Sequence, residues 1–225
     1  MSRTTLPVLL AGCLGTAACG HGRLVPSDAA ALVRGTDDAA VAFADGLRCT
    51  AETDAWEGKP GDLPASVAPI KVRISNDSEK PVRVRYEDFA LVGESGRTYR
   101  PLPLIPFEHD ARVPISPIYA SDRFFVAPRL HDVYPELPSW SNPLPRDEAL
   151  YAREYAKWGD THPDRHVLRE GLPEGMLAGG GSVTGFLYFE SPTGRERGAT
   201  LAAEFDRGGD AKGLITKLEI PFRVE

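Results

Sequence analysis

Apolar and charged side chains alternate with a period of two residues in the first half of the chain, and this alternation constrains the fold more than any other feature. In the segment 70–74, Ile, Val and Ile occupy alternate positions, with Lys and Arg between them. This pattern predicts a strand with one buried face and one solvated face. The segment 82–86 alternates in the same way, and the turn-forming run 76–81 separates the two. We therefore expect a β-hairpin over 70–86.

More strands of this kind are expected along the chain. They cover residues 89–92, 97–100, 183–189, 199–205 and 214–222. Roughly seven or eight short strands separated by turn signals favour an all-β fold, an antiparallel β-sandwich. No internal repeat divides the sequence, so we expect a single domain over residues 39–225. With 42% hydrophobic residues, the chain can bury such a core.

Residues 101–170 do not fit the strand pattern. Ten of the 20 prolines lie within 101–145, and this density excludes regular central strands. The segment also carries too many aromatic side chains for a solvated linker. We therefore expect an ordered, largely irregular insertion that packs on the sandwich. Its one regular element is predicted to be a short helix, with Asp147 as its N-cap and Trp158 near its end.

The first 20 residues have the pattern of an export signal. One cation, Arg3, precedes an apolar run in which small residues stand ahead of a cysteine. The run is a poor permanent membrane span, because it is rich in Gly, Pro and Cys and spanning needs about 20 apolar residues. Its end resembles a bacterial lipoprotein signal, in which the cysteine is acylated and becomes the first residue of the mature chain.

Two cysteines can be the acylated residue. The residues ahead of Cys13 match the lipoprotein motif well, but cleavage there would leave a very short apolar region. Cleavage before Cys19 gives a signal peptide of normal apolar length over residues 1–18. We favour Cys19, with Cys13 as the alternative. Residues 19–38 are then expected to form the lipidated N-terminus and a flexible tether.

The lipoprotein resemblance implies a location and a partner. Two or three acyl chains on Cys19 would hold the protein stably in a lipid bilayer. In lipoproteins of this kind, an Asp after the cysteine often signals retention at the inner membrane. Gly20 stands at that position, so the resemblance implies a lipid-anchored protein of the bacterial cell envelope at the outer membrane.

One further thiol, Cys49, would remain in the mature chain. It has no partner for an intramolecular disulfide once Cys13 leaves with the signal peptide. Leu47, Cys49 and Ala51 share one face of a predicted strand. We therefore predict that Cys49 is a buried structural residue and not a nucleophile.

Part of the chain resembles bacterial secreted immunoglobulin-like domains of the telokin-like type. The segments that carry this resemblance are 70–82, 88–92, Gly96, Tyr99 and the glycine-containing turn and strand 179–189. The resemblance covers about half of the chain and implies an immunoglobulin-like β-sandwich. It implies no functional residues. The insertion 101–170 departs from the family pattern, and we expect any individual activity to lie there.

Three histidines are candidate metal ligands. His162 and His166 are four residues apart, which on a helix would turn both toward one ion, and His131 could join them. However, Pro163 disfavours a continuous helix, and neither His-Glu-x-x-His nor Cys-x-x-Cys occurs. Exposed loop histidines are the stronger interpretation, and we expect no cofactor.

Catalytic motifs and nucleic-acid signals are weak. The turn 93–96, Gly-Glu-Ser-Gly, falls one residue short of the Gly-x-Ser-x-Gly motif of serine hydrolases. The formal net charge is −6 and no run of five basic residues occurs, which disfavours a nucleic-acid partner. We therefore assign no catalytic residues.

The aromatic residues of the insertion are the candidate binding surface for an unidentified envelope protein. They are Phe124, Phe125, Tyr134, Trp140, Tyr151, Tyr155 and Trp158. The helical stripe among them is more typical of packing than of a ligand platform. The sequence thus favours a non-catalytic, membrane-anchored envelope lipoprotein that serves as a binding or structural module. The alternatives are a metal-dependent or hydrolytic enzyme built in the insertion, and a carrier of small apolar ligands.

Overall fold

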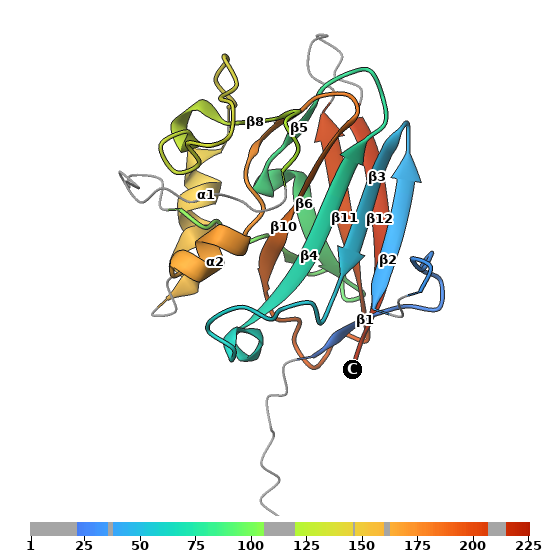
Figure 1. Ribbon diagram of the computed structural model, residues 1–225. Coiled ribbons are helices and arrows are strands. Elements are labelled where there is room, and N and C mark those ends of the chain that lie inside the picture. Colours follow the sequence, from blue (N-terminus) through green and yellow to red (C-terminus); the bar gives the residue numbers. More distant parts are fainter. Residues whose placement is uncertain (1–21, 36–37, 106–119, 146, 160–162, 207–214) are drawn as a thin grey trace, which may run out of the picture.

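The alternating segments form antiparallel strands in a computed structural model, which describes residues 22–35, 38–105, 120–145, 147–159, 163–206 and 215–225. Two larger sheets face each other, and a third, three-stranded sheet completes the fold (Figure 1). The predicted all-β class and antiparallel sandwich are therefore confirmed.

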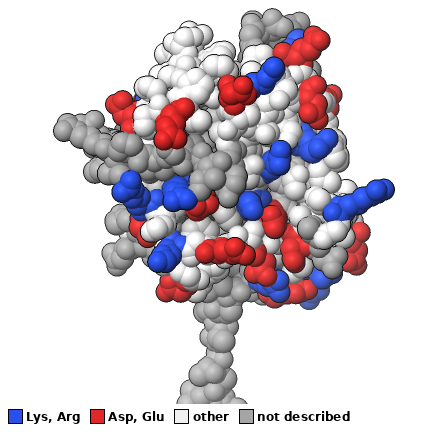
Figure 2. Space-filling model, viewed as in Figure 1, with Lys and Arg blue, Asp and Glu red and all other residues white. Residues whose placement is uncertain are grey.

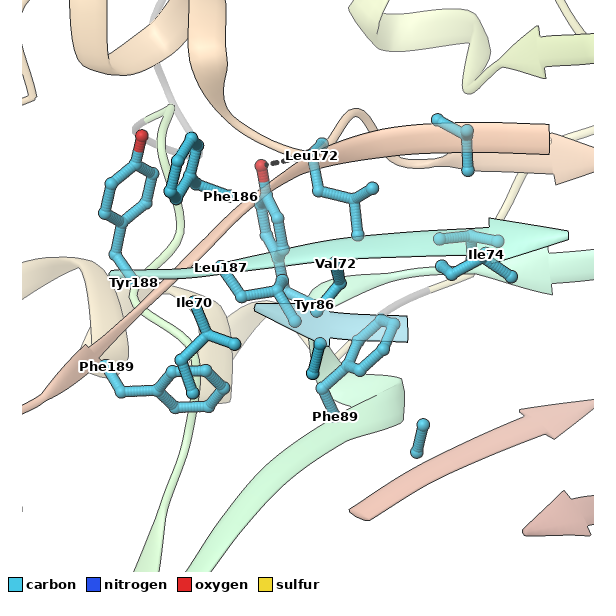
Figure 3. Close-up of a cluster of buried hydrophobic side chains, with 14 of the residues drawn as sticks. Ile70, Val72, Ile74, Tyr86, Phe89, Leu172, Phe186, Leu187, Tyr188 and Phe189 are labelled. Atoms are coloured by element: carbon cyan, nitrogen blue, oxygen red, sulfur yellow. Dashed lines mark hydrogen bonds between the residues drawn. The ribbon is translucent and has the colours of Figure 1, made fainter. Parts of the chain in front are cut away.

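The front sheet in Figure 1 has the strand order β10-β4-β3-β2. Its strands are β2 (Ala39–Ala44), β3 (Leu47–Glu52), β4 (Val67–Asn76) and β10 (Gly181–Glu190). The alternation that predicted β4 is explained by its packing, because Ile70, Val72 and Ile74 are fully buried in the core (Figure 3). Cys49 on β3 is buried and free, and burial raises its pKa to about 12, as expected for a structural thiol.

The back sheet has the strand order β1-β12-β11-β6-β7. Its strands are β1 (Leu24–Pro26), β6 (Phe89–Gly93), β7 (Thr98–Tyr99), β11 (Gly198–Asp206) and β12 (Ile215–Val224). Phe89 and Phe205 meet edge to face in the core, with ring centroids 5.6 Å apart. Both rings are fully buried, and together with the front-sheet residues they form the hydrophobic core between the two sheets.

The predicted hairpin over 70–86 is wrong, although both of its strands exist. The second strand, β5 (Val82–Val84), pairs with β9 (Gly175–Leu177) in the third sheet and not with β4. Both edges of β4 are already occupied by β3 and β10. The turn over 76–81 therefore passes the chain from one sheet to another.

The insertion contains more regular structure than the sequence predicts. Helix α1 (Glu148–Tyr155) is confirmed, and the Asp147 side chain accepts a hydrogen bond from the Leu150 N–H at 2.9 Å. A second helix, α2 (Arg165–Glu170), follows it. Strand β8 (Phe124–Val126) also lies in the insertion, as an edge strand of the third sheet beside β9. Short 3-10 helices in the described part of the chain, inside and outside the insertion, are Leu63–Ala65, Tyr86–Asp88, Pro128–Leu130 and Ala156–Trp158.

The start of the insertion and the segment directly after it cover the outer edge of β10. The Leu102 N–H donates to the Tyr188 carbonyl at 2.7 Å, and the Leu172 N–H donates to the Phe186 carbonyl at 3.0 Å. These bonds occupy backbone groups that an open sheet edge would expose to other chains. Figure 1 shows α1 and α2 on this side of the sandwich.

The predicted tether over 19–38 is wrong for the part that the structure describes. Leu24–Pro26 form β1, which pairs with the end of β12, and Leu24 is buried. The reason is that Leu24 and Pro26 are both buried, with the less buried Val25 between them. This alternation is too short to stand out in a polar stretch of sequence. Residues 1–21, which include the predicted signal peptide with Cys13 and Cys19, lie outside the described residues.

Candidate functional site

The predicted metal ligands do not form a described cluster. His131 follows the 3-10 turn Pro128–Leu130, and His166 lies in the first turn of α2. Both side chains are exposed, and His162 lies outside the described residues. Within the described ranges, no three His, Cys, Asp or Glu side chains are close enough to hold a metal ion.

Most of the predicted aromatic surface is in the core, which corrects that prediction. The buried members are Phe124, Tyr134, Tyr151 and Trp158. The Trp158 indole N–H donates to the Pro103 carbonyl at 2.7 Å, so this ring fixes one end of the insertion. Arg129 lies over the Tyr151 ring at 5.5 Å. These rings hold the insertion together and against the sandwich, which agrees with the packing interpretation of the helical stripe.

The other three aromatic residues are half-buried. Phe125 and Trp140 meet edge to face at 5.8 Å, next to a parallel bridge between Val126 and Ser139. Tyr155 lies at the end of α1. Phe125, Trp140 and Tyr155 are thus the members of the predicted surface that another molecule can reach.

A buried polar junction joins the insertion to the sandwich. The Glu174 carboxylate accepts from the Tyr86 N–H at 3.0 Å and pairs with Arg129 at 3.2 Å. The Tyr86 hydroxyl donates to the Leu172 carbonyl at 2.8 Å (Figure 3). Burial raises the pKa of Tyr86 well above its ordinary value, so the phenol remains a donor. We assign these groups to structure, because each bonds another part of the chain.

Charged side chains line a groove of about 280 Å³ near the start of α1. Arg85 pairs with both Glu87 and Asp88, and its guanidinium also donates to the Pro145 carbonyl at 2.7 Å. Burial raises the pKa of Asp88 to about 6, although the hydrogen bonds and positive charge of Arg85 act in the opposite direction. Because Arg85 is committed to these partners and to the insertion, this groove also has a structural explanation.

Ser95 lies in the turn between β6 and β7, the turn whose sequence falls one residue short of the serine hydrolase motif. The Ser95 hydroxyl donates to the Glu196 carboxylate, and the Ser95 N–H donates to the same group at 3.1 Å. Tyr99 also donates to it at 3.4 Å. These hydrogen bonds, with those from Ser95 first, lower the pKa of Glu196. Glu196 is thus a clamp on this turn.

Acidification is expected to weaken the Glu196 clamp. A carboxylate with a lower pKa in the folded than in the unfolded chain stabilises the fold above its unfolded value, near 4.5. This stabilisation is lost as the pH falls through the lower, folded value. Urea unfolding between pH 3 and pH 7 should therefore show that Glu196→Gln loses less unfolding free energy on acidification than the unmodified protein does. Glu94→Gln, at an exposed position of the same turn, should lose as much as the unmodified protein. The same dependence of stability on pH in all three proteins would contradict the role of Glu196.

A cavity of about 220 Å³ lies at the end of the sandwich where the described chain begins. We call it the N-terminal cavity, and its lining residues are Gly22, Arg23, Leu24, Thr53, Asp54, Trp56, Pro64, Val67, Ala68, Pro69 and Ser191. Most of this wall is apolar. The sequence does not reveal this cavity, because residues 19–38 fit a lipidated N-terminus and a flexible tether. The short alternation at Leu24 and Pro26 is the one sequence signal that could have revealed it.

Three polar features accompany the apolar wall. Arg23 and Asp54 form an ion pair at 2.7 Å with both side chains more than half exposed, at 56% and 63%. Thr53 is 4% exposed, and its hydroxyl has no hydrogen-bond partner among the described residues. Trp56 packs edge-on against Phe186 at 5.1 Å and is itself half-buried. An apolar pocket with a few placed polar groups is typical of ligand sites.

The charges on the face shown in Figure 2 are mixed, with Lys and Arg interspersed among Asp and Glu. None of the helices in the described ranges has the length and apolar character needed to cross a membrane.

Comparisons with known proteins identify no family. No family model matches the chain, and no curated protein matches it. Two solved structures are similar at a TM-score of 0.33. One is a "putative lipoprotein (ycdA)" from Bacillus subtilis subsp. subtilis str. 168, at 13% sequence identity. The match covers 80% of this chain but 38% of that one, so it spans well under half of that protein. The other is a "functionally unknown protein" from Listeria monocytogenes EGD-e, at 12% identity, covering 90% of this chain and 85% of that one.

Proposed function

We propose that this protein is a non-catalytic lipoprotein of the bacterial cell envelope, anchored through acyl chains on Cys19. The observation that carries the proposal is the export signal with small residues directly before that cysteine. The anchored body is an antiparallel sandwich, which we assign to the immunoglobulin-like, telokin-like type on the resemblance of residues 70–82 and 179–189. Outer-membrane placement follows from Gly20 after the cysteine.

The packing of the first described residues supports an anchor close to the body. A Cβ on Gly22 would lie 2.1 Å from the Val224 side chain, so the chain lies directly against β12 at this point. Cys19 precedes Gly22 by three residues, a span of at most about 11 Å when fully extended. An acylated Cys19 therefore keeps this end of the sandwich at the bilayer surface.

The non-catalytic assignment is supported by how the reactive groups are engaged. Cys49 is buried with a raised pKa, and Ser95 is bonded to Glu196. Arg85 is paired with neighbouring carboxylates and with the insertion. We propose that the protein acts by binding, with an envelope protein as partner and no nucleic acid. Phe125, Trp140 and Tyr155 are the predicted surface residues that such a partner can reach.

The intact mass of the protein from its own host membranes tests the anchor. We expect a mature chain that begins at Cys19 and carries two or three acyl chains. Cys13→Ser should leave this mass unchanged, because residue 13 departs with the signal peptide, whereas Cys19→Ser should remove the acyl mass. A mature chain that begins at Cys13, or one without acyl chains, would contradict the proposal.

A further inference from the structure

The front sheet is covered along one edge and open along part of the other. The edge of β10 is occupied by backbone bonds, whereas at the opposite edge β2 is the last strand of the sheet. Residues 31–33 pair with the first half of β2. The Val33 N–H donates to the Ala39 carbonyl at 2.9 Å, and the Val41 N–H donates to the Ala31 carbonyl at 2.8 Å. Beyond Val41, no segment in the described ranges pairs with this edge.

The open part of the edge lies at Phe43. Successive residues of a strand direct their backbone groups to its two edges in turn, so those of Ala39, Val41 and Phe43 all point away from β3. The N–H and carbonyl of Phe43 and the carbonyl of Val41 therefore face outward with no described strand beside them. Such an edge is a template for an extended chain.

Strand β2 lacks the features that usually protect an edge. Its residues, 39–44, are Ala, Val and Phe, with no charge and no proline. The neighbouring edge of β12 is covered by β1 at residues 222–224 and carries Lys217, Glu219 and Pro221 over the rest of its length. Charged side chains and prolines discourage pairing at an edge. Of these two edges, β2 is thus the one suited to receive a strand.

The exposed large apolar side chains of the described chain lie along this side of the sandwich. They are Leu32, Phe43 and Ile215, which are 50%, 62% and 62% exposed. Leu32 lies opposite Ala40 of β2. Ile215 begins β12 next to Thr216, whose hydroxyl donates to the Asp45 carboxylate of the β2–β3 turn at 3.0 Å. Figure 1 shows β2 and β12 together on this side. Clustered apolar exposure marks an interaction surface.

A second copy of the chain fits this edge poorly. Two β2 strands that pair around a two-fold axis are antiparallel. Strand β2 runs away from the anchor end of the sandwich, because Ala39 lies opposite Glu52, next to the N-terminal cavity, and Ala44 leads into the turn at the other end. The anchors of two such copies would point in opposite directions and could not enter one bilayer. The exclusion of a second copy rests on the proposed anchor at Cys19.

We propose that an extended segment of another envelope protein adds to the front sheet as a further strand beside Phe43. Its backbone bonds the open groups of Val41 and Phe43, and its uncharged side chains, apolar at alternate positions, pack beside the Phe43 ring. Arg48 lies over this ring at 5.1 Å and holds it at the edge. The open edge is short, so the contact is reversible. This strand site deepens the proposed function, because it is the surface through which the module binds its partner.

Hydrogen exchange of the full mature chain in non-ionic detergent tests the strand site. The probe is a peptide of alternating Val and Thr, with a Lys at each end outside the paired stretch. The Phe43 amide should exchange fast in the free protein and at least about tenfold more slowly with the peptide bound. The Val41 amide is already bonded to Ala31 and should change little. An unchanged Phe43 amide at the highest peptide concentration would overturn the proposal.

Two matched variants and a modified peptide show whether the bound peptide is a strand on β2. Phe43→Lys places a charge on the edge and should weaken peptide binding at least about tenfold. Ile215→Lys changes a side chain of equal exposure on β12 and should leave binding unchanged. A peptide with methylated backbone nitrogens keeps its side chains but loses its donors, and should not bind. Equal binding by the two variants, or of the two peptides, would contradict a strand beside Phe43.

The anchor and the strand site can fail separately. A chain without acyl chains whose Phe43 amide is protected by the peptide would overturn the anchor and leave the strand site in place. An acylated chain without this protection would overturn the strand site and leave the anchor in place. Light scattering of the full chain checks the choice of partner: a dimer that Phe43→Lys dissociates would show that a second copy occupies the edge, and would overturn the assignment to another protein.

Discussion

Replacing Asn76 by alanine is expected to lower the free energy of unfolding by about 4 kcal/mol, one of the two largest effects in the molecule. The side chain is fully buried where the chain leaves β4. Its amide nitrogen donates to the Lys80 carbonyl at 2.8 Å and to the Leu177 carbonyl at 3.0 Å. Its oxygen accepts from the N–H and the hydroxyl of Ser78. Alanine would remove the amide donor from both carbonyls, so that the Lys80 carbonyl would keep only the Ser78 hydroxyl at 3.2 Å, and it would open a cavity as well.

Urea unfolding of Asn76→Ala and Ser78→Ala measures this effect. Ser78 is only partly buried, so its alanine variant loses a smaller contribution and should cost about 1 kcal/mol. If the two variants were equally stable, Asn76 would not be the residue that holds the crossing between the sheets. Because Leu177 belongs to β9, the Asn76 variant should also loosen the third sheet, which hydrogen exchange at residues 82–84 would detect.

The second large effect is expected for Gly185→Ala, at about 3 kcal/mol. Gly185 lies in the middle of β10, opposite Val72 of β4. An added Cβ would lie 2.5 Å from the backbone nitrogen and Cα of Leu172. Because these are backbone atoms, they can move only if the segment that follows α2 leaves the sheet. The variant should therefore lose the Leu172 to Phe186 hydrogen bond along with stability.

Limited proteolysis and urea unfolding together check this expectation. We expect faster cleavage between α2 and β9 in Gly185→Ala, together with a lower unfolding midpoint. Gly61→Ala is the control, because the space around Gly61 is open and its φ is not positive; its stability should change by less than about 0.5 kcal/mol. A Gly185→Ala protein as stable as the Gly61→Ala protein would show that the Leu172 backbone is not packed against β10 as described.

Strand positions could be predicted from the sequence, but strand pairing could not. Alternation reports which side chains are buried, and β4 and β5 both follow it. Which strands pair depends on contacts far apart in the chain, such as the Asn76 bond to Leu177. A turn sequence between two alternating segments therefore fits a hairpin and a crossing between sheets equally well. Helix α1 was predictable because its cap, Asp147, is a local signal.

The candidate site was harder to predict than the fold. Aromatic residues in a proline-rich segment fit a binding surface and a core equally well in sequence, and Tyr134 and Trp158 belong to the core. The N-terminal cavity combines residues from 22–24, 53–56 and 64–69. No spacing rule links these segments, because β1 and β4 belong to different sheets and residues 53–56 lie in the loop after β3.

The described chain begins and ends at one place. The backbones of Arg23 and Glu225 exchange two hydrogen bonds, at 2.9 Å and 2.8 Å, and Figure 1 shows β1 and the carboxyl end together. A reporter protein fused after Glu225 would therefore lie next to the N-terminal cavity and, with the proposed anchor on Cys19, would crowd the membrane surface. A short peptide linker could join these two ends of the described chain. The chain could then be opened at a loop at the opposite end of the sandwich, such as the β2–β3 turn, and the new termini there would serve as the point of attachment.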